Sequence, residues 1–505
     1  MNRALYALLA LLACTAQSGH AQENIACLAL ADLDLPATAK LTVEHIPAGP
    51  YTTSTFGSSR QTTADVPSFC RVAGVVEPAI RFEVWLPQAG EWNGRFQAVG
   101  GGGFAGVVSY PAMIPNLQAG YVTASTDTGH VAGELEWLAD EGLLRDYGYR
   151  AIHEMTQKSK ALIEAYYGRA ADYNYFVGCS TGGRQGLMEA QRFPDDYDGI
   201  VSGAPVNYFV ATHYAQLWAS RAAKPVGPTL ISWADRELVN RAALAQCDVA
   251  DGVTDGVIED PRSCELDLRP LQCSEHGPAR CLLEDQIEAF EAIYAGPVNS
   301  RTGRHLHPGL MPGSELSWNL TDGSDLVTIP REYFRRSVFG DPSWDWRSFD
   351  FDADVERSEQ QTGEVLNAID PDLSSYRNGG GKLLLYHGWN DQGIFPVGSI
   401  NYYREVASEL ASSEASAIDE ARDFFRLFMV PGMAHCRGGP GPNQFDAVAA
   451  IEAWVERGEV PAKIVASKIE AGEVIRTRPL CPYPEIAQYT GSGDTDDHQN
   501  FVCAE

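Results

Sequence analysis

The chain has 505 residues, enough for a domain of ordinary size together with a large insertion or a second domain. Hydrophobic residues make up 44% of it and aromatic residues 10%, which is typical of a globular protein and not of a disordered one. Acidic residues outnumber basic ones by 67 to 38, and the formal net charge is −29. This charge repels phosphate backbones and anionic lipid surfaces, so it argues against nucleic-acid and membrane-surface partners.

Residues 1–21 are typical of a secretory leader. Arg3 provides the positive start, residues 4–13 are apolar, and residues 19–21 supply a small-residue cleavage site. The apolar run is too short to span a bilayer. An alternative is a lipoprotein signal in which Cys14 becomes the lipidated end. We expect cleavage after Ala21 and a secreted or periplasmic protein without a membrane span.

Removal of the leader takes away Cys14 of the 11 cysteines and leaves an even number, which predicts disulfides in an exported chain. Zinc binding is the competing interpretation, and the lack of a Cys-x-x-Cys pair in the sequence disfavours it. Sequence alone leaves the connectivity open. The spacing favours four local pairs and leaves the two other cysteines for each other: Cys27–Cys70, Cys247–Cys264, Cys273–Cys281, Cys481–Cys503, and then Cys179 with Cys436.

Strands and helices alternate through the first part of the chain. Apolar or alternating stretches predict strands at 80–87, 95–99, 120–126, 173–177 and 197–205, with a weaker pattern at 41–43. Residues 146–167 have helix-forming composition, and Gly168 is a plausible cap. This rhythm predicts a mostly parallel sheet that is covered on both faces.

A Gly-x-Ser-x-Gly motif at residues 178–182 follows the predicted strand 173–177 and precedes a predicted helix at 185–192. Such a context predicts a nucleophile elbow, in which a sharp turn exposes Ser180 above the sheet. An ordinary Gly-rich turn is the alternative. The serine is preceded by Cys179, and a similar pairing of cysteine with a catalytic candidate recurs at His435-Cys436.

Four consecutive glycines, residues 100–103, end the predicted strand 95–99. A main-chain N–H in such a loop can point at a developing alkoxide, so Gly101 and Gly102 are candidates for an oxyanion donor. A flexible loop is one alternative. A phosphate loop is another, but the Gly-Lys-Ser/Thr ending that it requires is missing.

Two late buried strands are each followed by a candidate partner for the serine. Residues 382–386 lead into a loop with Asp391, and residues 424–430 lead into a loop with His435. The order Ser180, Asp391, His435 is the serine, acid, histidine order of α/β-hydrolases. His387 is a rival base, but it precedes the acid and breaks this order.

The alternation breaks down between residues 206 and 366, which are rich in aromatic residues and short loops. An insertion of this length between core strands predicts a lid over the active site. Its rings, which include those of residues 333–334, 344–346 and 349–351, could stack on a planar substrate. The alternative is that they form the core of the insertion itself.

An acidic loop lies within the insertion. Its carboxylates and the carbonyls of two valines offer oxygen ligands of the kind that suits Ca²⁺: Asp248, Asp251, Val253, Asp255 and Val257. The spacing differs from that of an EF-hand, and a solvated acidic turn is the alternative. A metal ion here is expected to be structural.

Four segments taken together resemble the tannase and feruloyl esterase family, to which bacterial mono(2-hydroxyethyl) terephthalate hydrolase also belongs. They are residues 178–184, the acidic loop 248–257, His-Gly-x-x-Asp at 387–391 and Pro-Gly-Met-x-His-Cys at 431–436. The likeness covers essentially the whole mature chain, including the tail 477–484.

The resemblance implies an α/β-hydrolase fold with a large lid domain inserted between core strands. It implies a catalytic domain at residues 22–205 and 367–505, with a lid domain at 206–366 that holds structural Ca²⁺ on the five residues above. It also implies a disulfide between Cys179 and Cys436 that brings Ser180 and His435 together. The N–H groups of Thr181 and of Gly101 or Gly102 would then hold the oxyanion.

The expected function is that of a secreted serine esterase that cleaves small esters of hydroxycinnamic acids, as feruloyl esterases do. Tannase activity on gallate esters and terephthalate monoester hydrolysis are alternatives on the same scaffold. A peptidase is a further alternative, since Gly-x-Ser-x-Gly also serves peptidases. From a different class, the chain could be an aromatic-binding protein without turnover, but the intact Ser180, Asp391 and His435 argue against this.

Arg335 or Arg336 of the lid is a candidate to meet a phenol or carboxylate of the substrate, with ordinary surface arginines as the alternative.

Overall fold

The computed structural model describes residues 24–54, 61–223, 230–274, 280–320, 325–411, 413 and 416–505. The expected leader, residues 1–21, lies outside the described residues. The chain divides into two compact units, residues 1–134 with 149–176, and residues 135–148 with 177–505. In the described part of the chain, no helix combines the length and the apolar character that crossing a membrane requires.

The first unit is built on a mixed sheet. Its strands are β1 (Thr42–Ile46), β4 (Phe69–Val76), β5 (Ile80–Pro87), β6 (Arg95–Val99), β7 (Val122–Thr126) and β8 (Tyr173–Cys179). They follow the order β1-β4-β5-β7-β6-β8, and β8 continues into the second unit from Val177. Pairing is antiparallel from β1 to β7, whereas β6 joins β7 in parallel. The sequence predicted β5 and β6 with these bounds, but it did not predict the antiparallel part of the sheet.

A short helix at residues 24–29, two longer helices and a hairpin also belong to the described part of the first unit. Helix α2 (Tyr110–Gln118) packs Met113 and Leu117 into a cluster with Trp85 of β5. Helix α4 (Ala151–Tyr167) ends at Gly168, whose φ of 71° is the left-handed cap expected from the sequence. The hairpin pairs β2 (Gly49–Ser54) with β3 (Gln61–Val66).

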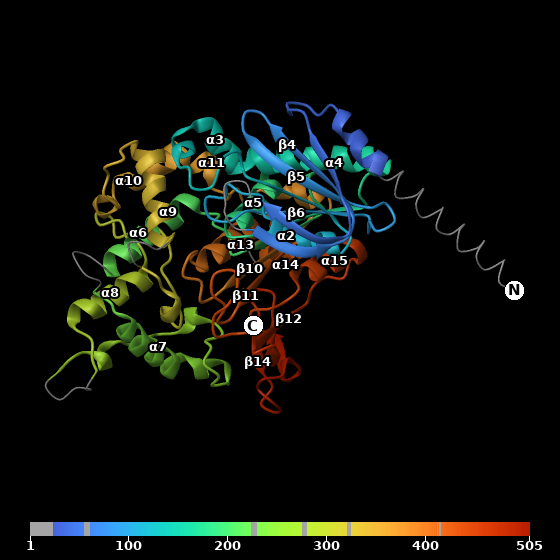
Figure 1. Ribbon diagram of the computed structural model, residues 1–505. Coiled ribbons are helices and arrows are strands. Elements are labelled where there is room, and N and C mark those ends of the chain that lie inside the picture. The colour runs from blue at the N-terminus through green and yellow to red at the C-terminus, as the bar shows by residue number, and fades with distance from the viewer. Residues whose placement is uncertain are drawn as a thin grey trace. The chain divides into compact units, whose positions relative to one another are not determined.

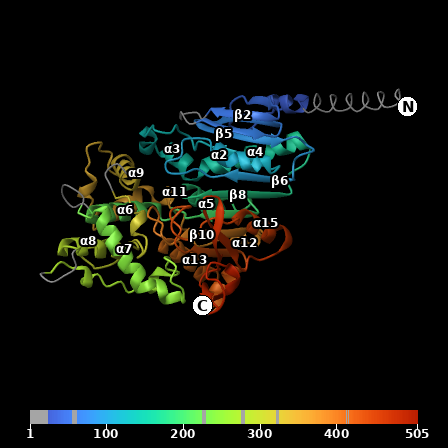
Figure 2. The same ribbon diagram turned by 60° about the horizontal axis from the view of Figure 1, so that its bottom comes forward.

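The second unit contains three parallel strands, β9 (Gly199–Gly203), β10 (Lys382–Gly388) and β11 (Phe425–Val430). Strand β10 lies between the other two and pairs in parallel with both. Helices α5 (Thr181–Arg192) and α15 (Ala447–Arg457) pack against these strands (Figure 2). Because the carboxyl ends of parallel strands meet at one edge of a sheet, the loops after β10 and β11 are neighbours.

Helices fill the described chain between β9 and β10. They are α6 (Phe209–Ala223), α7 (Trp233–Cys247), α8 (Glu284–Ala295), α9 (Asp325–Tyr333), α10 (Asp354–Ser358), α11 (Glu364–Leu366) and α12 (Ser374–Asn378). Helices α6, α8, α9 and α10 gather in one region of Figure 1, in green to yellow. The short helix α3 (Glu141–Arg145) also belongs to the second unit. Tyr333, Phe334 and Phe349 are almost fully buried and pack together, so these rings form the core of this segment.

The carboxyl-terminal part adds helices α13 (Val397–Leu410) and α14 (Ala417–Arg422) and two antiparallel hairpins. One hairpin pairs β12 (Ile464–Glu470) with β13 (Glu473–Leu480), and the other pairs β14 (Ile486–Tyr489) with β15 (Phe501–Ala504). Neither hairpin was predicted from the sequence.

Five disulfides are present, and they are the pairs that the sequence favoured: Cys27–Cys70, Cys179–Cys436, Cys247–Cys264, Cys273–Cys281 and Cys481–Cys503. Only the first belongs to the first unit. Four of the five close loops of 43 residues or fewer, whereas Cys179–Cys436 spans 257 residues.

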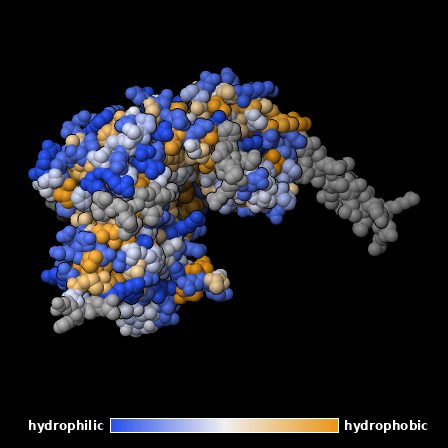
Figure 3. All heavy atoms as spheres, turned by 60° about the vertical axis from the view of Figure 1, so that its left-hand side comes forward, coloured by the Kyte–Doolittle hydropathy of each residue, from blue (hydrophilic) through white to orange (hydrophobic). Residues whose placement is uncertain are grey.

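Hydrophilic residues cover much of the face drawn in Figure 3, with smaller apolar patches between them. Exposed apolar side chains include Val474 and Ile475 of β13 and Val502 of β15. Val474 pairs across the β12–β13 hairpin with Ile469, which is also exposed.

Candidate active site

Ser180 occupies a strained turn between β8 and α5. Its φ of 64° and ψ of −122° lie in a region that residues with a side chain rarely adopt. The Ser180 N–H donates to the Gly203 carbonyl at 2.9 Å, and its carbonyl accepts the N–H of Arg184 at 3.0 Å. A sharp turn from a strand into a helix, with a serine at the strained position, is the geometry of a nucleophile elbow.

The glycines around the serine are required by close approach of the main chain. A Cβ at Gly178 would lie 2.5 Å from the Gly182 main chain, and one at Gly183 would lie 2.4 Å from the Gly203 oxygen. Both distances are shorter than any real Cβ contact. The turn can therefore form only with glycine at these positions.

Asp391 and His435 meet at the carboxyl ends of β10 and β11. His435 Nδ1 donates to Asp391 Oδ2 at 2.7 Å. The other carboxylate oxygen accepts the N–H groups of Gly393 at 2.7 Å and Ile394 at 2.9 Å. These contacts satisfy a carboxylate that is fully buried.

The electrostatics of this pair suit a general base. Burial by itself disfavours the Asp391 charge, but His435 and the hydrogen bonds from His387 and His435 hold the pKa of Asp391 well below its usual range. Burial likewise disfavours a charged His435, but the Asp391 carboxylate outweighs it and raises the pKa of His435 above its ordinary value. The pair therefore strengthens His435 as a proton acceptor while Asp391 stays ionised.

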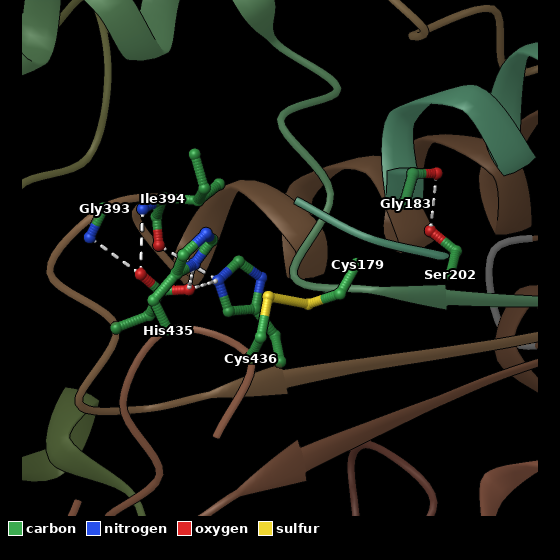
Figure 4. The surroundings of a disulfide bond; sticks show 9 residues. Cys179, Gly183, Ser202, Gly393, Ile394, His435 and Cys436 are labelled. Carbon is green, nitrogen blue, oxygen red and sulfur yellow. Dashed lines mark hydrogen bonds and ion pairs between the residues drawn. A yellow bond between two sulfur atoms is a disulfide. The ribbon is translucent and has the colours of Figure 1, made fainter. Parts of the chain in front are cut away.

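A disulfide joins the residue before the serine to the residue after the histidine. Cys179 and Cys436 are bonded with their Cα atoms 6.1 Å apart, and Figure 4 shows the bond beside the His435 ring. Within the described residues, Ser180 and His435 make no direct hydrogen bond. Catalytic hydrogen bonds are often long in the free enzyme and shorten when substrate binds, so the disulfide, which keeps the two loops together, is the relevant constraint.

Arg184 is a buried cation whose role the sequence did not reveal. It is fully buried in α5 and donates to the carbonyls of Tyr147 at 3.0 Å and Gly148 at 2.9 Å. It also donates to the carbonyl of Leu366, the last residue of the predicted lid, at 3.3 Å. Burial lowers the pKa of Arg184. Helix α5, which follows Ser180, is thus tied to the end of the predicted lid segment at Leu366.

His387, the rival candidate for the base, contacts Asp391 in the structure. Its Nε2 is 3.2 Å from Asp391 Oδ2 and 3.0 Å from the Ile394 carbonyl, and the ring is fully buried. The Asp391 carboxylate therefore contacts two histidine rings, those of His387 and His435. The order Ser180, Asp391, His435 favours His435 as the base, which stays a prediction, and it gave no sign that His387 contacts Asp391.

The candidate oxyanion glycines belong to the first unit, in the loop after β6. The Ala105 N–H donates to the Gly102 carbonyl at 2.8 Å, which closes a tight turn. A Cβ at Gly102 would meet no atom within 4 Å, whereas one at Gly101 would lie 3.1 Å from Ala105 Cβ. Thr181, the other candidate donor, is the first residue of α5 and is buried. Which glycine donates stays a prediction.

The acidic loop folds back on itself in the second unit. The Asp248 carboxylate accepts the N–H groups of Asp255 at 3.3 Å and Gly256 at 2.9 Å. Gly252 and Gly256 have φ of 87° and 83°, the left-handed conformation that such tight turning needs. The loop therefore concentrates three carboxylates and several carbonyls in a short stretch of chain.

A small cavity opens beside this loop, with room for about one water-sized particle. Asp251, Asp255, Val257 and Glu259 line it, together with the cationic side chain of Arg478. Burial and the charges of Asp255 and Asp248 raise the pKa of Asp251 to about 6, and burial raises that of Glu259 to about 8. A cation would stabilise the ionised forms of such carboxylates, so the donor set fits a hard metal ion.

Two residues beside the acidic loop went unnoticed in the sequence. Glu259 lines the cavity and accepts the Ala487 N–H at 3.0 Å. Arg478, from β13, donates to Asp255, and Arg476 pairs with the same carboxylate at 3.1 Å. The tail segment 477–484, which is part of the family resemblance, therefore contacts the acidic loop, although more than 200 residues separate the two in the sequence.

The two lid arginines that were candidates for substrate contact are paired within the protein. Arg335 and Arg336 both form ion pairs with Glu332, at 3.4 Å each. Arg335 also donates to the Trp344 carbonyl at 2.8 Å. Nothing in these contacts directs either side chain to a ligand.

The family model described as tannase and feruloyl esterase matches residues 63–504 of the chain. The chain belongs to this family. The protein is therefore a carboxylic ester hydrolase of the feruloyl esterase and tannase type, with the α/β-hydrolase fold and the serine nucleophile typical of the family.

Two curated relatives and one solved structure cover nearly all of this esterase. An uncharacterized esterase of Xanthomonas campestris pv. campestris is 38% identical over 540 aligned positions, which cover 96% of this chain and 92% of that protein. The mono(2-hydroxyethyl) terephthalate hydrolase of Piscinibacter sakaiensis is 34% identical, over 87% of this chain and 85% of that one. The crystal structure of feruloyl esterase B from Aspergillus oryzae has a TM-score of 0.86 and 28% identity, over 95% of this chain and 100% of that chain.

Proposed function

We propose that Ser180, Asp391 and His435 are the catalytic triad of an exported esterase that cleaves esters of hydroxycinnamic acids, as feruloyl esterases do. The observation that supports the proposal is the 2.7 Å hydrogen bond from His435 to the buried, ionised Asp391. The Cys179–Cys436 disulfide also links the turn that contains Ser180 to the loop that contains His435.

The mechanism follows from the roles of these groups. His435 Nε2 takes the proton of Ser180 as the hydroxyl oxygen attacks the ester carbonyl, and Asp391 stabilises the resulting imidazolium. The N–H of Thr181, at the positive end of α5, and the N–H of Gly101 or Gly102 are the proposed donors to the oxyanion. His435 then protonates the leaving alcohol. Water, activated by the same histidine, releases the aromatic acid from the serine.

We further propose a catalytic domain at residues 22–205 and 367–505, with residues 206–366 as a lid domain. Support comes from the helical character of the described residues between β9 and β10 and from their own aromatic core. In this proposal the lid forms one side of the substrate pocket. Enzymes that share the mechanism can therefore differ, through their lids, in the aromatic acid of the ester that they accept.

Calcium is the proposed metal of the acidic loop. The carboxylates of Asp248, Asp251 and Asp255 and the carbonyls of Val253 and Val257 would hold it, and all of these are the oxygen ligands that Ca²⁺ prefers. When bound, the ion neutralises the crowded carboxylates and holds the loop together. It takes no part in the proton transfers.

Export is proposed because the ten cysteines of the described residues are all joined in disulfides. The proposed leader is residues 1–21, with cleavage after Ala21 and Cys14 removed with it.

Initial rates of the purified mature protein on methyl ferulate, methyl gallate and mono(2-hydroxyethyl) terephthalate test the substrate class, with Ser180→Ala as the blank. We expect methyl ferulate to have the highest kcat/KM and the variant to be inactive. Preference for gallate would indicate a tannase. Preference for the terephthalate ester would indicate the activity named for the Piscinibacter sakaiensis relative. Either result would overturn the ferulate assignment and leave the triad intact.

A further inference from the structure

The acid of the proposed triad is held by a second histidine that the reaction scheme above does not use. Both His435 Nδ1, at 2.7 Å, and His387 Nε2, at 3.2 Å, contact the same oxygen of Asp391. A serine esterase needs only one histidine on its acid. His387 is fully buried in β10, where a polar ring is retained only if its hydrogen bonds are satisfied.

The surroundings of His387 fix which ring nitrogen carries its hydrogen. Nε2 faces two acceptors, Asp391 Oδ2 and the Ile394 carbonyl at 3.0 Å, so the hydrogen belongs on this nitrogen. Nδ1 lies 2.7 Å from the hydroxyl oxygen of Ser399, near the start of α13. In the neutral ring the Ser399 hydroxyl donates to Nδ1, which leaves Nε2–H to point at the acid.

The bonds of His387 reach the acid loop at two points. Nε2–H contacts the Asp391 carboxylate and also the carbonyl of Ile394, whose own N–H donates to Asp391 Oδ1 at 2.9 Å. Gly393 and Ile394 donate to Oδ1 of this carboxylate and His435 donates to Oδ2, and Figure 4 shows these three residues gathered together. His387 therefore constrains the rotation of the carboxylate and the loop that holds its second oxygen.

We propose that His387, with its tautomer set by Ser399, is a positioning residue that aims Oδ2 of Asp391 at His435. The inference rests on the proposed triad. The chain of bonds runs from the Ser399 hydroxyl to His387, from His387 to Asp391, and from Asp391 to His435. The titratable groups in contact with His387 are Asp391 directly and His435 through it. Buried networks of this kind fix orientation when every member is satisfied.

Positioning and simple packing make different predictions for the pH profile. If His387 aims the carboxylate, its loss weakens the Asp391–His435 bond, and that bond is what raises the pKa of His435. The acid limb of kcat/KM then moves to lower pH, towards the ordinary value for histidine, while the plateau falls. If His387 only fills space, its loss lowers the amount of folded enzyme and leaves the limb where it was.

The experiment measures kcat/KM against pH for the whole mature protein and three variants, with circular dichroism as a check of folding. Ser399→Ala removes the donor to Nδ1 with a small change of volume. His387→Leu removes both polar atoms, and His387→Gln retains an N–H near the position of Nε2. We expect plateaus of Ser399→Ala and His387→Leu about 10- to 100-fold below wild type, the scale on which misplaced catalytic groups reduce rates. Both acid limbs should move to lower pH, and His387→Gln should recover most of the plateau and the limb.

An unchanged limb in folded Ser399→Ala, or a limb that moves to higher pH, would overturn the inference. A limb at higher pH would mean that the hydrogen bond from His387 weakens the interaction of the Asp391 carboxylate with His435. Should His387→Leu fail to fold, Ser399→Ala and His387→Gln still decide the question. Failure of the proposed triad is distinguishable, because wild type and Ser180→Ala would then hydrolyse the ester at equal rates.

Discussion

Gly432, in the loop that carries His435, lies directly against Val257 of the acidic loop. A Cβ at Gly432 would come within 3.1 Å of Val257 Cγ1, and its φ of 67° also favours glycine. Pro431, which precedes Gly432, lines the same cavity as Asp251 and Glu259. The proposed metal loop and the loop of the proposed catalytic histidine are thus packed together, although about 180 residues separate them in the sequence.

Removal of the metal should therefore affect both stability and activity. We expect a calcium chelator to lower the Tm, because an ion that binds only the folded state stabilises it in proportion to the logarithm of its concentration. Added Ca²⁺ should restore both Tm and kcat, whereas Mg²⁺ should not, because Mg²⁺ demands a tighter octahedral site.

Two variants test whether the response of Tm to Ca²⁺ depends on the acidic loop. They are Asp251→Asn and, as a matched control outside the loop, Asp267→Asn. Asp267 is a half-exposed aspartate paired with Arg269, outside the loop. The first variant should lose the response of Tm to Ca²⁺, and the second should keep it. A Tm that does not respond to chelator in the wild-type protein would rule out a stabilising ion.

The Cys179–Cys436 disulfide should matter more for turnover than any other. Replacing both cysteines by alanine removes a link over 257 residues, for which the chain-entropy treatment gives about 5.5 kcal/mol of stability. The matched control, Cys27→Ala with Cys70→Ala, removes a link over 43 residues worth about 4 kcal/mol by the same treatment.

Both double variants should lower the Tm, but only the first should lower kcat in the fraction that remains folded, because only this link joins the serine and histidine loops. Titration of active sites with a fluorophosphonate gives the folded, competent fraction. Equal kcat per titrated site in the two variants would contradict a positioning role for Cys179–Cys436.

Gly183→Ala should prevent formation of the elbow. The added methyl group would lie 2.4 Å from the Gly203 oxygen, and main-chain atoms on both sides leave no room for relaxation. A loss of several kcal/mol is expected, typical of overpacked cores. Gly90→Ala is the control, since a Cβ there meets no atom within 4 Å. Chemical denaturation of both variants checks this, and a Gly183→Ala protein as stable as Gly90→Ala would show that the turn is not as close as described.

The pH dependence of kcat/KM should reflect the raised pKa of His435. The histidine accepts the serine proton only when neutral, so activity should fall as pH drops through this pKa. Because Asp391 raises it, the acid limb should lie above the ordinary histidine value of 6.5. Asp391→Asn removes the charge and should move the limb down while reducing kcat severely. An acid limb below 6.5 in the wild type would contradict the described pairing.

The sequence predicted the elements that carry the site better than those that surround it. Strand β10 contains the apolar run 383–385, and strand β11 is apolar at every position except Arg426. The polar loops after these strands stand out, so the loops that contain Asp391 and His435 could be predicted. The antiparallel strand β4 and the hairpins β12 to β15 have shorter or mixed patterns that resemble loops. The ring of Phe349 could equally have belonged to a core or to a binding surface, and only its packing shows that it is core.

Contacts between distant residues were beyond the sequence. His387 was ranked below His435 by chain order alone, because its bond to Ser399 depends on how α13 packs on β10. Arg184 belongs to the recognised motif, but its carbonyl partners lie in separate segments. Glu259 follows the acidic loop at a spacing that no ligand pattern marks, and only its position in the cavity reveals it.

Ser180 is expected to carry the acyl group during turnover, and acid-quenched mass spectrometry of the enzyme with methyl ferulate detects this intermediate. A feruloyl adduct should form on the peptide that contains Ser180 in the wild type and be absent from Ser180→Ala, which should also lose hydrolysis. Turnover of the ester by Ser180→Ala at the wild-type rate, or an adduct on another residue, would contradict it.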